Sequence, residues 1–327
     1  MTTTLRWGIA STGQISTSMA TALAAIDGAV VSAVGSRTQA AADAFAAQFD
    51  IPHSHGSYDE LWADDDVDII YVGSPHSEHH AMTTAALEAG RHVLCEKAFA
   101  INAAEASEMI DTARRHDRFL MEAMWSWFMP AWHDLRSRLA DGVIGRVVTV
   151  DANFCIPVHD PDGRHRRPDL AGGALLDLGI YPLSLGRFLL GEPTDVRALG
   201  TLTEHAVDAT LGGVMRHADG AVTTFRTSLD AMSRLDATIV GTDGSITIDA
   251  PFWCPTSFTI RPAGSTDDIE RVEHPHRGLA HEAEHAMARI AAGAIESDVQ
   301  TWAATLANME LMDEIRRQVG VVYPDER

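Results

Sequence analysis

The alternation of short apolar runs with helical patterns in the first third of the chain constrains its fold more than any other feature. Apolar runs typical of buried strands occur near residues 5–10, 29–34, 68–73, 92–95 and 119–121. Segments with helical patterns, several of them rich in alanine, separate these runs. Strands that alternate with helices form parallel sheets, because a parallel connection must cross over the sheet. The sequence therefore predicts an N-terminal α/β domain of the Rossmann type.

The pattern changes after about residue 123. Strands now follow one another with few helices between them, and Asp219-Gly220 and Asp243-Gly244 are typical hairpin turns. We expect strands near residues 147–154, 195–203, 207–216, 221–229, 235–241, 245–250 and 258–261, and helices near 172–190, 279–292 and 299–318. This predicts an α+β domain with an open, mainly antiparallel sheet. At 327 residues the chain is long enough for two domains, which we expect at 1–122 and 123–327.

Charge and cysteine content restrict the function and the compartment. The formal net charge of −21 repels phosphate backbones and anionic lipids, so we expect neither nucleic-acid nor membrane partners. No apolar run suggests a membrane span, and the start of the chain lacks the pattern of a signal peptide. The three cysteines form no CxxC pair. These features predict a cytoplasmic protein with no disulfide framework.

The first strand, turn and helix lie where a dinucleotide-binding fold places its phosphate loop. The three glycine positions of that loop fall on Ser11, Gly13 and Ser16, so only Gly13 matches. The second strand ends at Ser36-Arg37, where an acid would bind the ribose diol of NAD. A guanidinium at this place suits the 2′-phosphate of NADP, although a solvated arginine in the first turn of a helix is the simpler alternative. We therefore expect NADP(H) as the cofactor.

Lys97 is the only lysine among the 25 basic residues, and it follows a buried strand at the carboxyl edge of the predicted sheet. Arginine can replace lysine as a solvated charge, but it does not release a proton in a protein. Lys97 is therefore a catalytic candidate, with a structural ion pair as the alternative. Asp177 and Tyr181 are four residues apart on an otherwise apolar helix, which places them on one helix face. They form an acid–base candidate, and the alternative is a hydrogen bond on the helix surface.

One motif suggests different chemistry. His281-Glu282-Ala-Glu-His285 matches the HExxH pattern of zinc proteases, but no third ligand is evident and the segment is typical of a solvated amphipathic helix. The pairs His53/His55, His79/His80 and His274/His276 lack partner ligands at a telling spacing. We therefore expect no metal site.

Several segments resemble the glucose–fructose oxidoreductase/inositol dehydrogenase (Gfo/Idh/MocA) family, and within it the dihydrodiol dehydrogenase and NADP-dependent D-xylose 1-dehydrogenase subgroup. They include Leu5-Arg-Trp-Gly-Ile, Val93-Leu-Cys-Glu-Lys, Met121-Glu-Ala-Met-Trp, Gly172 to Tyr181 and Trp253-Cys-Pro. The resemblance implies that Lys97, Asp177 and Tyr181 are the catalytic residues. It implies that Trp125 and Phe154 are aromatic residues of the substrate pocket. Ala98 replaces the family proline after the lysine.

The resemblance also implies a set of binding residues. The basic substrate residue is uncertain in register; we expect Arg166 and Arg167, with Arg164 as a further candidate. Residues expected to bind the cofactor are Ser11, Gly13, Gln14, Ile15, Ser36, Arg37, Ser74, Pro75, His76, His79, Glu96 and Lys97.

The activity implied by this resemblance is hydride transfer between NADP and a carbinol of a sugar or cyclic vicinal diol, in a site between the two domains. Tyr181 would take the hydroxyl proton, and Lys97 would stabilise the developing alkoxide. Asp177 would orient Lys97 and the substrate hydroxyl. The resemblance further implies a homodimer or higher homo-oligomer through the open face of the second sheet. A sensor that binds NAD(P) without turnover is the alternative, and an intact proton-transfer set argues against it.

Overall fold

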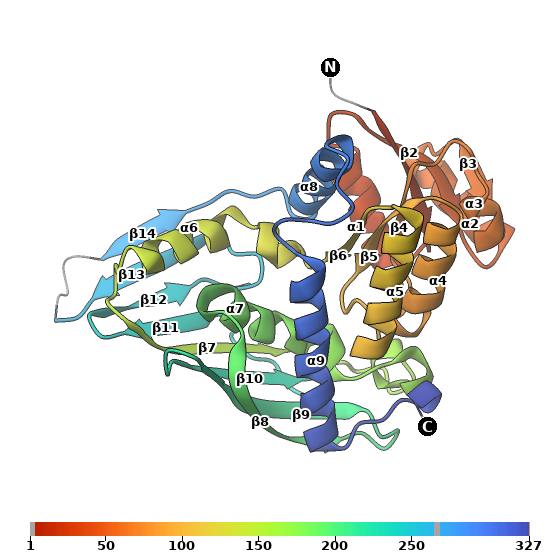
Figure 1. The fold of residues 1–327 in the computed structure, drawn as a ribbon. Helices are drawn as coiled ribbons and strands as arrows, with labels where there is room; N and C mark the ends of the chain where they lie inside the picture. Colours follow the sequence, from red (N-terminus) through yellow and green to blue (C-terminus); the bar gives the residue numbers. More distant parts are fainter. Residues whose placement is uncertain (1–3, 265–268, 327) are drawn as a thin grey trace. The chain divides into compact units, whose positions relative to one another are not determined.

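The computed structural model describes residues 4–264 and 269–326 and divides the chain into two compact units. Unit 1 comprises Met1–Trp125 and Arg277–Leu306, and unit 2 comprises Ser126–His276 and Ala307–Arg327. We expected a single boundary after residue 122. The chain instead leaves unit 1 after Trp125 and returns to it after residue 276. The cause is the packing of α8 (Ala280–Ala291) against α1 (Gln14–Leu23), which Figure 1 shows in blue and red.

Unit 1 is built on a six-stranded parallel sheet, as the sequence predicts. The strand order is β3-β2-β1-β4-β5-β6, and every neighbouring pair is parallel. The strands are β1 (Leu5–Ala10), β2 (Ala29–Gly35), β3 (His53–His55), β4 (Ile69–Val72), β5 (His92–Glu96) and β6 (Leu120–Ala123). The order reverses between β1 and β4, and in doubly wound sheets ligands bind beyond the carboxyl ends of the strands at this reversal.

The helices of unit 1 begin at residues that the sequence favours for capping. Thr38 accepts a hydrogen bond from the Ala41 amide at the start of α2, and Asn102 accepts one from the Glu105 amide at the start of α5. α4 and α5 lie side by side against the sheet (Figure 1). Besides α1 and α8, the helices are α2 (Gln39–Phe49), α3 (Tyr58–Trp62), α4 (His76–Glu88) and α5 (Ala103–His116). Strand β3 and helix α3 were not predicted, because both are shorter than the windows on which periodicity depends.

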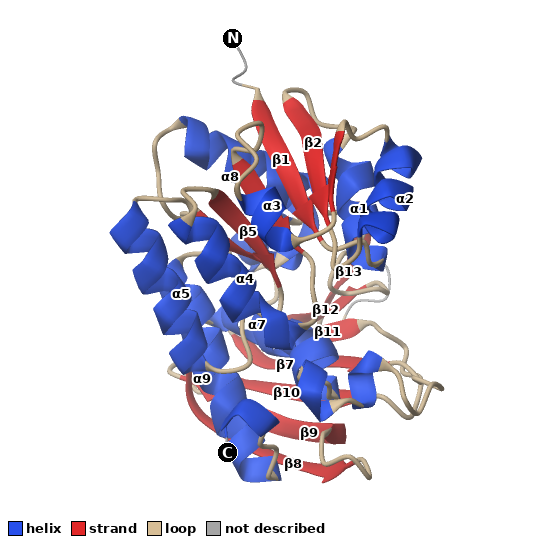
Figure 2. Ribbon diagram, turned by 90° about the vertical axis from the view of Figure 1, so that its right-hand side faces the viewer, coloured by secondary structure: helices blue, strands red, loops and turns tan. Residues whose placement is uncertain are grey.

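Unit 2 is built on an eight-stranded sheet of order β14-β13-β12-β11-β7-β10-β9-β8 (Figure 2). All pairs are antiparallel except β7 with β10, which confirms the prediction of a mainly antiparallel sheet. The strands are β7 (Val147–Cys155), β8 (Pro193–Leu202), β9 (Asp208–His217), β10 (Val222–Ser228), β11 (Ala237–Gly241), β12 (Gly244–Ile248), β13 (Ser257–Pro262) and β14 (Glu270–Glu273). Only β14 was not predicted.

Helices cover one face of this sheet. α7 (Ile180–Leu190) contacts β7 and β10, and the π-helical segment η4 (Leu175–Gly179) leads directly into it. Residues 168–190 are long and apolar enough to resemble a membrane span, contrary to the expectation from sequence, but 89% of the most apolar window is buried within the protein. We interpret this segment as the core helix of unit 2. The remaining elements are α6 (Pro130–Ala140), α9 (Trp302–Val319) and the 3-10 segments η1 (Trp125–Phe128), η2 (Arg164–Arg166), η3 (Pro168–Leu170) and η5 (Pro324–Glu326).

Candidate active site

The turn between β1 and α1 keeps the backbone of a phosphate-binding loop although two of its glycines are missing. Ser11 has a φ of +113°, a conformation that glycine adopts far more easily, and its hydroxyl accepts a hydrogen bond from the Gly13 amide. A Cβ atom on Gly13 would meet only the Ser11 Oγ, at 3.6 Å, so the space above the start of α1 is open. Within the described ranges, no side chain caps this helix start. The loop therefore fits a phosphate group bound by helix amides.

Ser16 explains how the third glycine position tolerates a side chain. It is fully buried, and a Cβ atom on Gly73 would come within 2.8 Å of its Oγ. The glycine that allows close packing of helix and strand has thus moved to the end of β4. Gln14 and Ile15 occupy the first turn of α1, as expected for residues beside the loop.

The end of β2 presents one cation. Ser36 is buried and Arg37 is exposed in the turn before α2, where no acid occupies the position that binds a ribose diol. The side chain of Arg37 is thus accessible to a ligand at the carboxyl edge of the sheet.

The loop after β4 is held by a histidine. Ser74 and Pro75 precede α4, and His76 begins it. His79 is fully buried, with its Nδ1 2.8 Å from the Ala98 carbonyl and its Nε2 2.9 Å from the Ser74 carbonyl. Burial lowers the pKa of His79 to about 4, so the ring is neutral and donates to one carbonyl at a time. His79 therefore connects the loops after β4 and β5 rather than presenting itself to a ligand.

Lys97 follows β5 directly and is half-buried. Its backbone amide donates to Glu96 Oε2 at 3.1 Å, and its peptide bond to Ala98 is cis. Glu96 is buried and accepts a second hydrogen bond from the Tyr71 hydroxyl at 2.6 Å. The backbone that carries the single lysine is thus anchored to the core of unit 1.

The glutamate of the HExxH helix does not lie on a solvated face as the sequence suggests. Glu282 is fully buried, and neither of its carboxyl oxygens has a hydrogen-bond partner among the described residues. Burial raises its pKa well above the ordinary value, and the nearby carboxyl groups of Glu96 and Glu122 raise it further. His281 accepts from the Arg277 amide, and His285 contacts the Ser297 hydroxyl. The motif therefore lies against the core of unit 1.

In unit 2, Asp177 lies in a cationic setting. Arg164 Nη2 is 3.1 Å from Asp177 Oδ1, and His165 Nε2 is 3.0 Å from Oδ2. The segment that carries Asp177 is anchored by Asp208, whose carboxylate accepts the Leu175 amide at 2.6 Å. Burial raises the pKa of Asp208 to about 6. The π-helical turn at Asp177 is of a kind frequent at functional sites.

The structure distinguishes the three candidate arginines. Arg166 pairs with Asp230 at 2.8 Å, and Arg167 pairs with Asp169, so neither contacts Asp177. Arg164, the further candidate from sequence, is the arginine that does. His165 was not predicted, and its only sequence signal is its place beside Arg164.

Tyr181, in the first turn of α7, belongs to an aromatic group. Phe154 and Trp253 stack with ring centroids 3.8 Å apart and planes 10° apart. The Tyr181 ring lies 5.5 Å from Phe154 and 5.8 Å from Trp253. Phe154 and Trp253 thus lie beside Tyr181, and Trp253 is a residue that we did not include among the expected site residues. Trp125 belongs to unit 1, where it begins η1.

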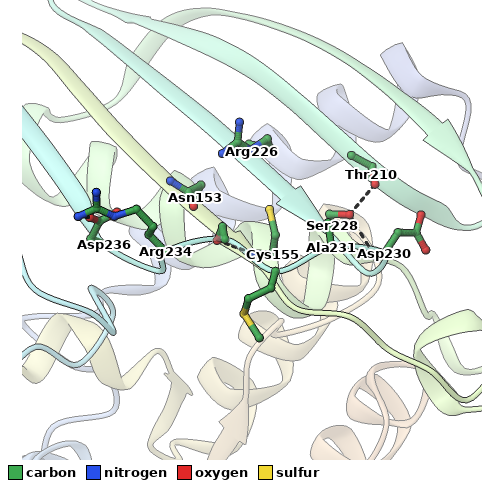
Figure 3. A pocket seen from close by; sticks show the side chains of 11 residues that line it. Asn153, Cys155, Thr210, Arg226, Ser228, Asp230, Ala231, Arg234 and Asp236 are labelled. Carbon is green, nitrogen blue, oxygen red and sulfur yellow. Dashed lines mark hydrogen bonds and ion pairs between the residues drawn. The ribbon is translucent and has the colours of Figure 1, made fainter.

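A separate cavity of about 620 Å³ is lined by residues of the unit 2 sheet (Figure 3), and it opens on the face of the sheet opposite to Phe154. Side chains alternate along a strand, so Asn153 and Cys155 of the cavity point away from the face that Phe154 occupies. This cavity is therefore distinct from the aromatic group. Its lining residues are Asn153, Cys155, Thr210, Arg226, Ser228, Asp230, Ala231, Met232, Ser233, Arg234 and Asp236.

The features described above are those of a nicotinamide-dependent oxidoreductase. They are a parallel sheet with an open phosphate loop, a lysine at the end of a strand, and a tyrosine four residues after an aspartate. Comparison with known proteins agrees. Residues 5–124 match the model of an oxidoreductase family with an NAD-binding Rossmann fold, and residues 132–247 match the Gfo/Idh/MocA C-terminal domain. A trans-1,2-dihydrobenzene-1,2-diol dehydrogenase from Xenopus tropicalis is 36% identical over 98% of this chain and 99% of its own length. The human enzyme of the same name is 33% identical over 99% of both chains.

The chain belongs to the Gfo/Idh/MocA family of oxidoreductases. This confirms the resemblance, the fold class and the prediction of a nicotinamide-dependent dehydrogenase. A 3-ketoreductase from Actinomadura kijaniata, solved with NADP and TDP-benzene, superimposes with a TM-score of 0.88 at 25% identity, over 97% of this chain and 98% of that one. An aldose–aldose oxidoreductase from Caulobacter crescentus, solved with glycerol, gives 0.87 at 25% identity over the same shares.

Proposed function

We propose that this protein is an NADP-dependent dehydrogenase that interconverts a secondary carbinol and a carbonyl on a sugar or a cyclic vicinal diol. The aromatic group around Tyr181 carries the proposal. Trp253 is half-buried and stacks on the buried Phe154, and its flat apolar ring suits the ring of a small cyclic substrate. Arg164, His165 and Asp177 offer hydrogen-bonding groups for its hydroxyls. The named activities of the relatives, on dihydrodiols and on sugars, fit such a site.

In the proposed reaction, each unit supplies part of the chemistry. The loop at Ser11 and Gly13 and the turn at Arg37 would hold the dinucleotide, and when bound the nicotinamide supplies the hydride acceptor or donor. Tyr181 would remove the substrate hydroxyl proton during oxidation and return it during reduction. Lys97 would stabilise the developing alkoxide, and Asp177 would orient the hydroxyl.

The experiment that tests this activity follows the absorbance of reduced nicotinamide with NADP or NAD against aldoses, inositols and trans-dihydrodiols. We expect turnover with at least one of these classes. Cofactor binding with no turnover on the whole panel would favour the NAD(P)-binding sensor instead.

Arg37 is the basis for proposing NADP. An exposed guanidinium at the end of β2 suits a 2′-phosphate, so NADPH should bind more tightly than NADH. Arg37→Asp should narrow or reverse that preference, because an acid repels the phosphate and accepts from the diol. Equal affinity of the wild-type protein for both cofactors, measured by fluorescence titration, would refute the assignment.

Lys97 is tested by a substitution that keeps its charge. If the lysine only formed an ion pair, Lys97→Arg would change stability by roughly half a kilocalorie per mole and leave turnover near normal. A planar guanidinium directs its donors differently from a compact ammonium, so we expect turnover to fall at least about a hundredfold. Lys97→Met should be equally inactive, with NADPH binding retained in both variants. Substantial activity of Lys97→Arg would exclude the proposed role.

We further propose a homo-oligomer and a cytoplasmic location. The sheet strands of unit 2 carry exposed apolar side chains, including Leu199 with 83% of its surface exposed, Val214 and Val240. Analytical ultracentrifugation of the wild-type protein and of Leu199→Glu tests whether a second copy covers them. The three cysteines are free thiols, which suits a reducing compartment.

A further inference from the structure

Two histidines and an aspartate come together at the edge of the unit 1 sheet, away from the residues proposed above for catalysis. His53 and His55 are two residues apart in β3, so their side chains leave the same face of the strand. The chain then passes through α3 and returns Asp64 to this face. Asp64 Oδ2 lies 2.8 Å from His53 Nδ1 and 2.8 Å from His55 Nε2. The three potential ligand atoms all lie within 4.8 Å of one another.

The side chains around this trio are arranged as those around a metal ligand usually are. Asp64 Oδ1 accepts the Asp66 amide at 2.9 Å, which fixes the carboxylate so that Oδ2 faces both rings. Asp66 Oδ2 lies 4.0 Å from His53 Nε2, the ring nitrogen that faces away from Asp64. Arg6 holds Asp66 in place through a 2.8 Å ion pair. A carboxylate that accepts the outer N–H of a ligating histidine orients the ring and raises its basicity. Asp66 would reach that position by moving about 1 Å closer to His53.

We propose that His53, His55 and Asp64 form a binding site for one divalent transition-metal ion, Zn²⁺ being the best match. Two imidazoles and one carboxylate are ligands typical of zinc, whereas Mg²⁺ and Ca²⁺ prefer sites made only of oxygen. Water would complete a tetrahedron. This site is independent of the proposed dehydrogenase activity, and it corrects our expectation from sequence that the His53/His55 pair lacks a partner.

Small side-chain movements suffice to admit the ion. Bonds of about 2.0–2.1 Å in a tetrahedron place ligand atoms roughly 3.3 Å apart. The two 2.8 Å contacts to Asp64 must therefore open by about half an ångström. The two ligating histidine nitrogens, which lie within 4.8 Å of each other, must reach the same separation, and rotation of the side chains can supply both movements. Both rings now present an N–H to the same carboxylate oxygen. On binding, the proton of His53 moves from Nδ1 to Nε2, on the side of Asp66, so a neutral ring needs no net proton loss there.

A metal at this place would join parts of unit 1 that are otherwise weakly held. β3 is a three-residue edge strand that pairs only with β2 among the described strands. The His55 carbonyl accepts the Ser36 amide, so β3 is bonded to the turn that carries Arg37. Because the ion would bind the folded chain and not the unfolded one, Zn²⁺ should raise the melting temperature.

The test uses the full-length protein after removal of metal with a chelator and dialysis. Co²⁺ is titrated while its visible absorption is recorded, and Zn²⁺ affinity is measured by competition with a chromophoric chelator. Variants His53→Gln, His55→Gln and Asp64→Asn each remove one ligand, and their circular dichroism verifies folding. His116→Gln is the matched control, because His116 is an exposed histidine of the same unit at the end of α5.

We expect one equivalent of Co²⁺ with a tetrahedral spectrum in the wild-type and His116→Gln proteins. Each ligand variant should bind Zn²⁺ at least about tenfold more weakly and lose the Zn²⁺-dependent rise in melting temperature. Mg²⁺ should have no effect. Absence of stoichiometric binding by the wild-type protein would overturn the proposal. Equal binding by the wild-type protein and the ligand variants would do so too, because the ion would then occupy other histidines.

Discussion

Glu282 offers a sharp test of the energetics of unit 1. Its carboxyl group is fully buried and has no hydrogen-bond partner in the part of the chain that the structure describes, so it should make stability depend on pH. Its pKa is raised by burial and by the carboxyl groups of Glu96 and Glu122. Below pH 4.5, the ordinary value for this carboxyl group, the acid is protonated in both the folded and the unfolded chain. Above that pH the unfolded chain releases the proton and the folded chain keeps it, so the free energy of unfolding falls as pH rises.

The substitution Glu282→Gln removes this dependence while keeping the shape of the side chain. Each pH unit between the unfolded and folded pKa values costs the wild-type protein about 1.4 kcal/mol relative to a group that does not titrate. Titration is still incomplete near pH 5, so we expect the variant to gain about 1 kcal/mol over the wild-type protein between pH 5 and pH 6. The gain should continue until the folded pKa is reached.

Native-state hydrogen exchange is the suitable assay, because a chain with two units does not guarantee a two-state transition. The slowest amides of β1 and β5 report the opening free energy of unit 1. Glu284→Gln is the control, because Glu284 is a more exposed acid two residues further along α8. Parallel pH profiles for the wild-type protein and Glu282→Gln would refute the reasoning, since the carboxyl group would then ionise in the folded state as it does in water.

Two further substitutions test the sites of the two units. Tyr181→Phe should lower turnover by about two to four orders of magnitude and leave NADPH affinity nearly unchanged, as measured by steady-state kinetics and fluorescence titration; near-normal turnover would place the base elsewhere. Ser11→Gly should raise the free energy of unfolding by up to about 1 kcal/mol, because glycine adopts a φ of +113° without the strain that serine bears there. A loss of stability in denaturant titration would mean that the hydroxyl contact with the Gly13 amide outweighs the strain.

The parts of the fold that could be predicted are those where periodicity extends over several turns or strands. The parallel sheet of unit 1, the antiparallel sheet of unit 2 and the hairpins at Asp219-Gly220 and Asp243-Gly244 all follow from local patterns. The return of α8 to unit 1 could not be predicted, because it depends on contacts with α1 more than 250 residues away in sequence. An amphipathic pattern shows that a helix has a buried face, but it does not show which core buries that face.

Some features of the candidate site could likewise be predicted from the sequence and others could not. The positions of Lys97, Asp177 and Tyr181 on their elements follow from sequence, because strand ends and helix spacing are local properties. The partners of Asp177 could not be predicted from the sequence, because Arg164 and its neighbours lie in a loop whose register no local pattern fixes. Trp253 reaches Tyr181 from a loop after β12. Its segment, Trp253-Cys-Pro, is among those that resemble the family, but no local pattern shows that this side chain lies beside Tyr181.

The HExxH motif and the His53-x-His55 pair show that the spacing of histidines does not by itself predict a metal site. HExxH has the spacing of a zinc site, but burial of Glu282 beside two other carboxyl groups raises the pKa of the acid that a zinc enzyme needs ionised as its base. His53-x-His55 has no telling partner in sequence, yet α3 returns Asp64 to within 2.8 Å of both rings. Spacing within one element fixes only which side chains share a face. Whether those side chains meet a cation or a desolvated core depends on what the rest of the chain places opposite them. We expect Zn²⁺ binding to require His53 and His55 and to survive the substitution His281→Gln. That result would show that the groups opposite a histidine motif determine whether it binds a metal.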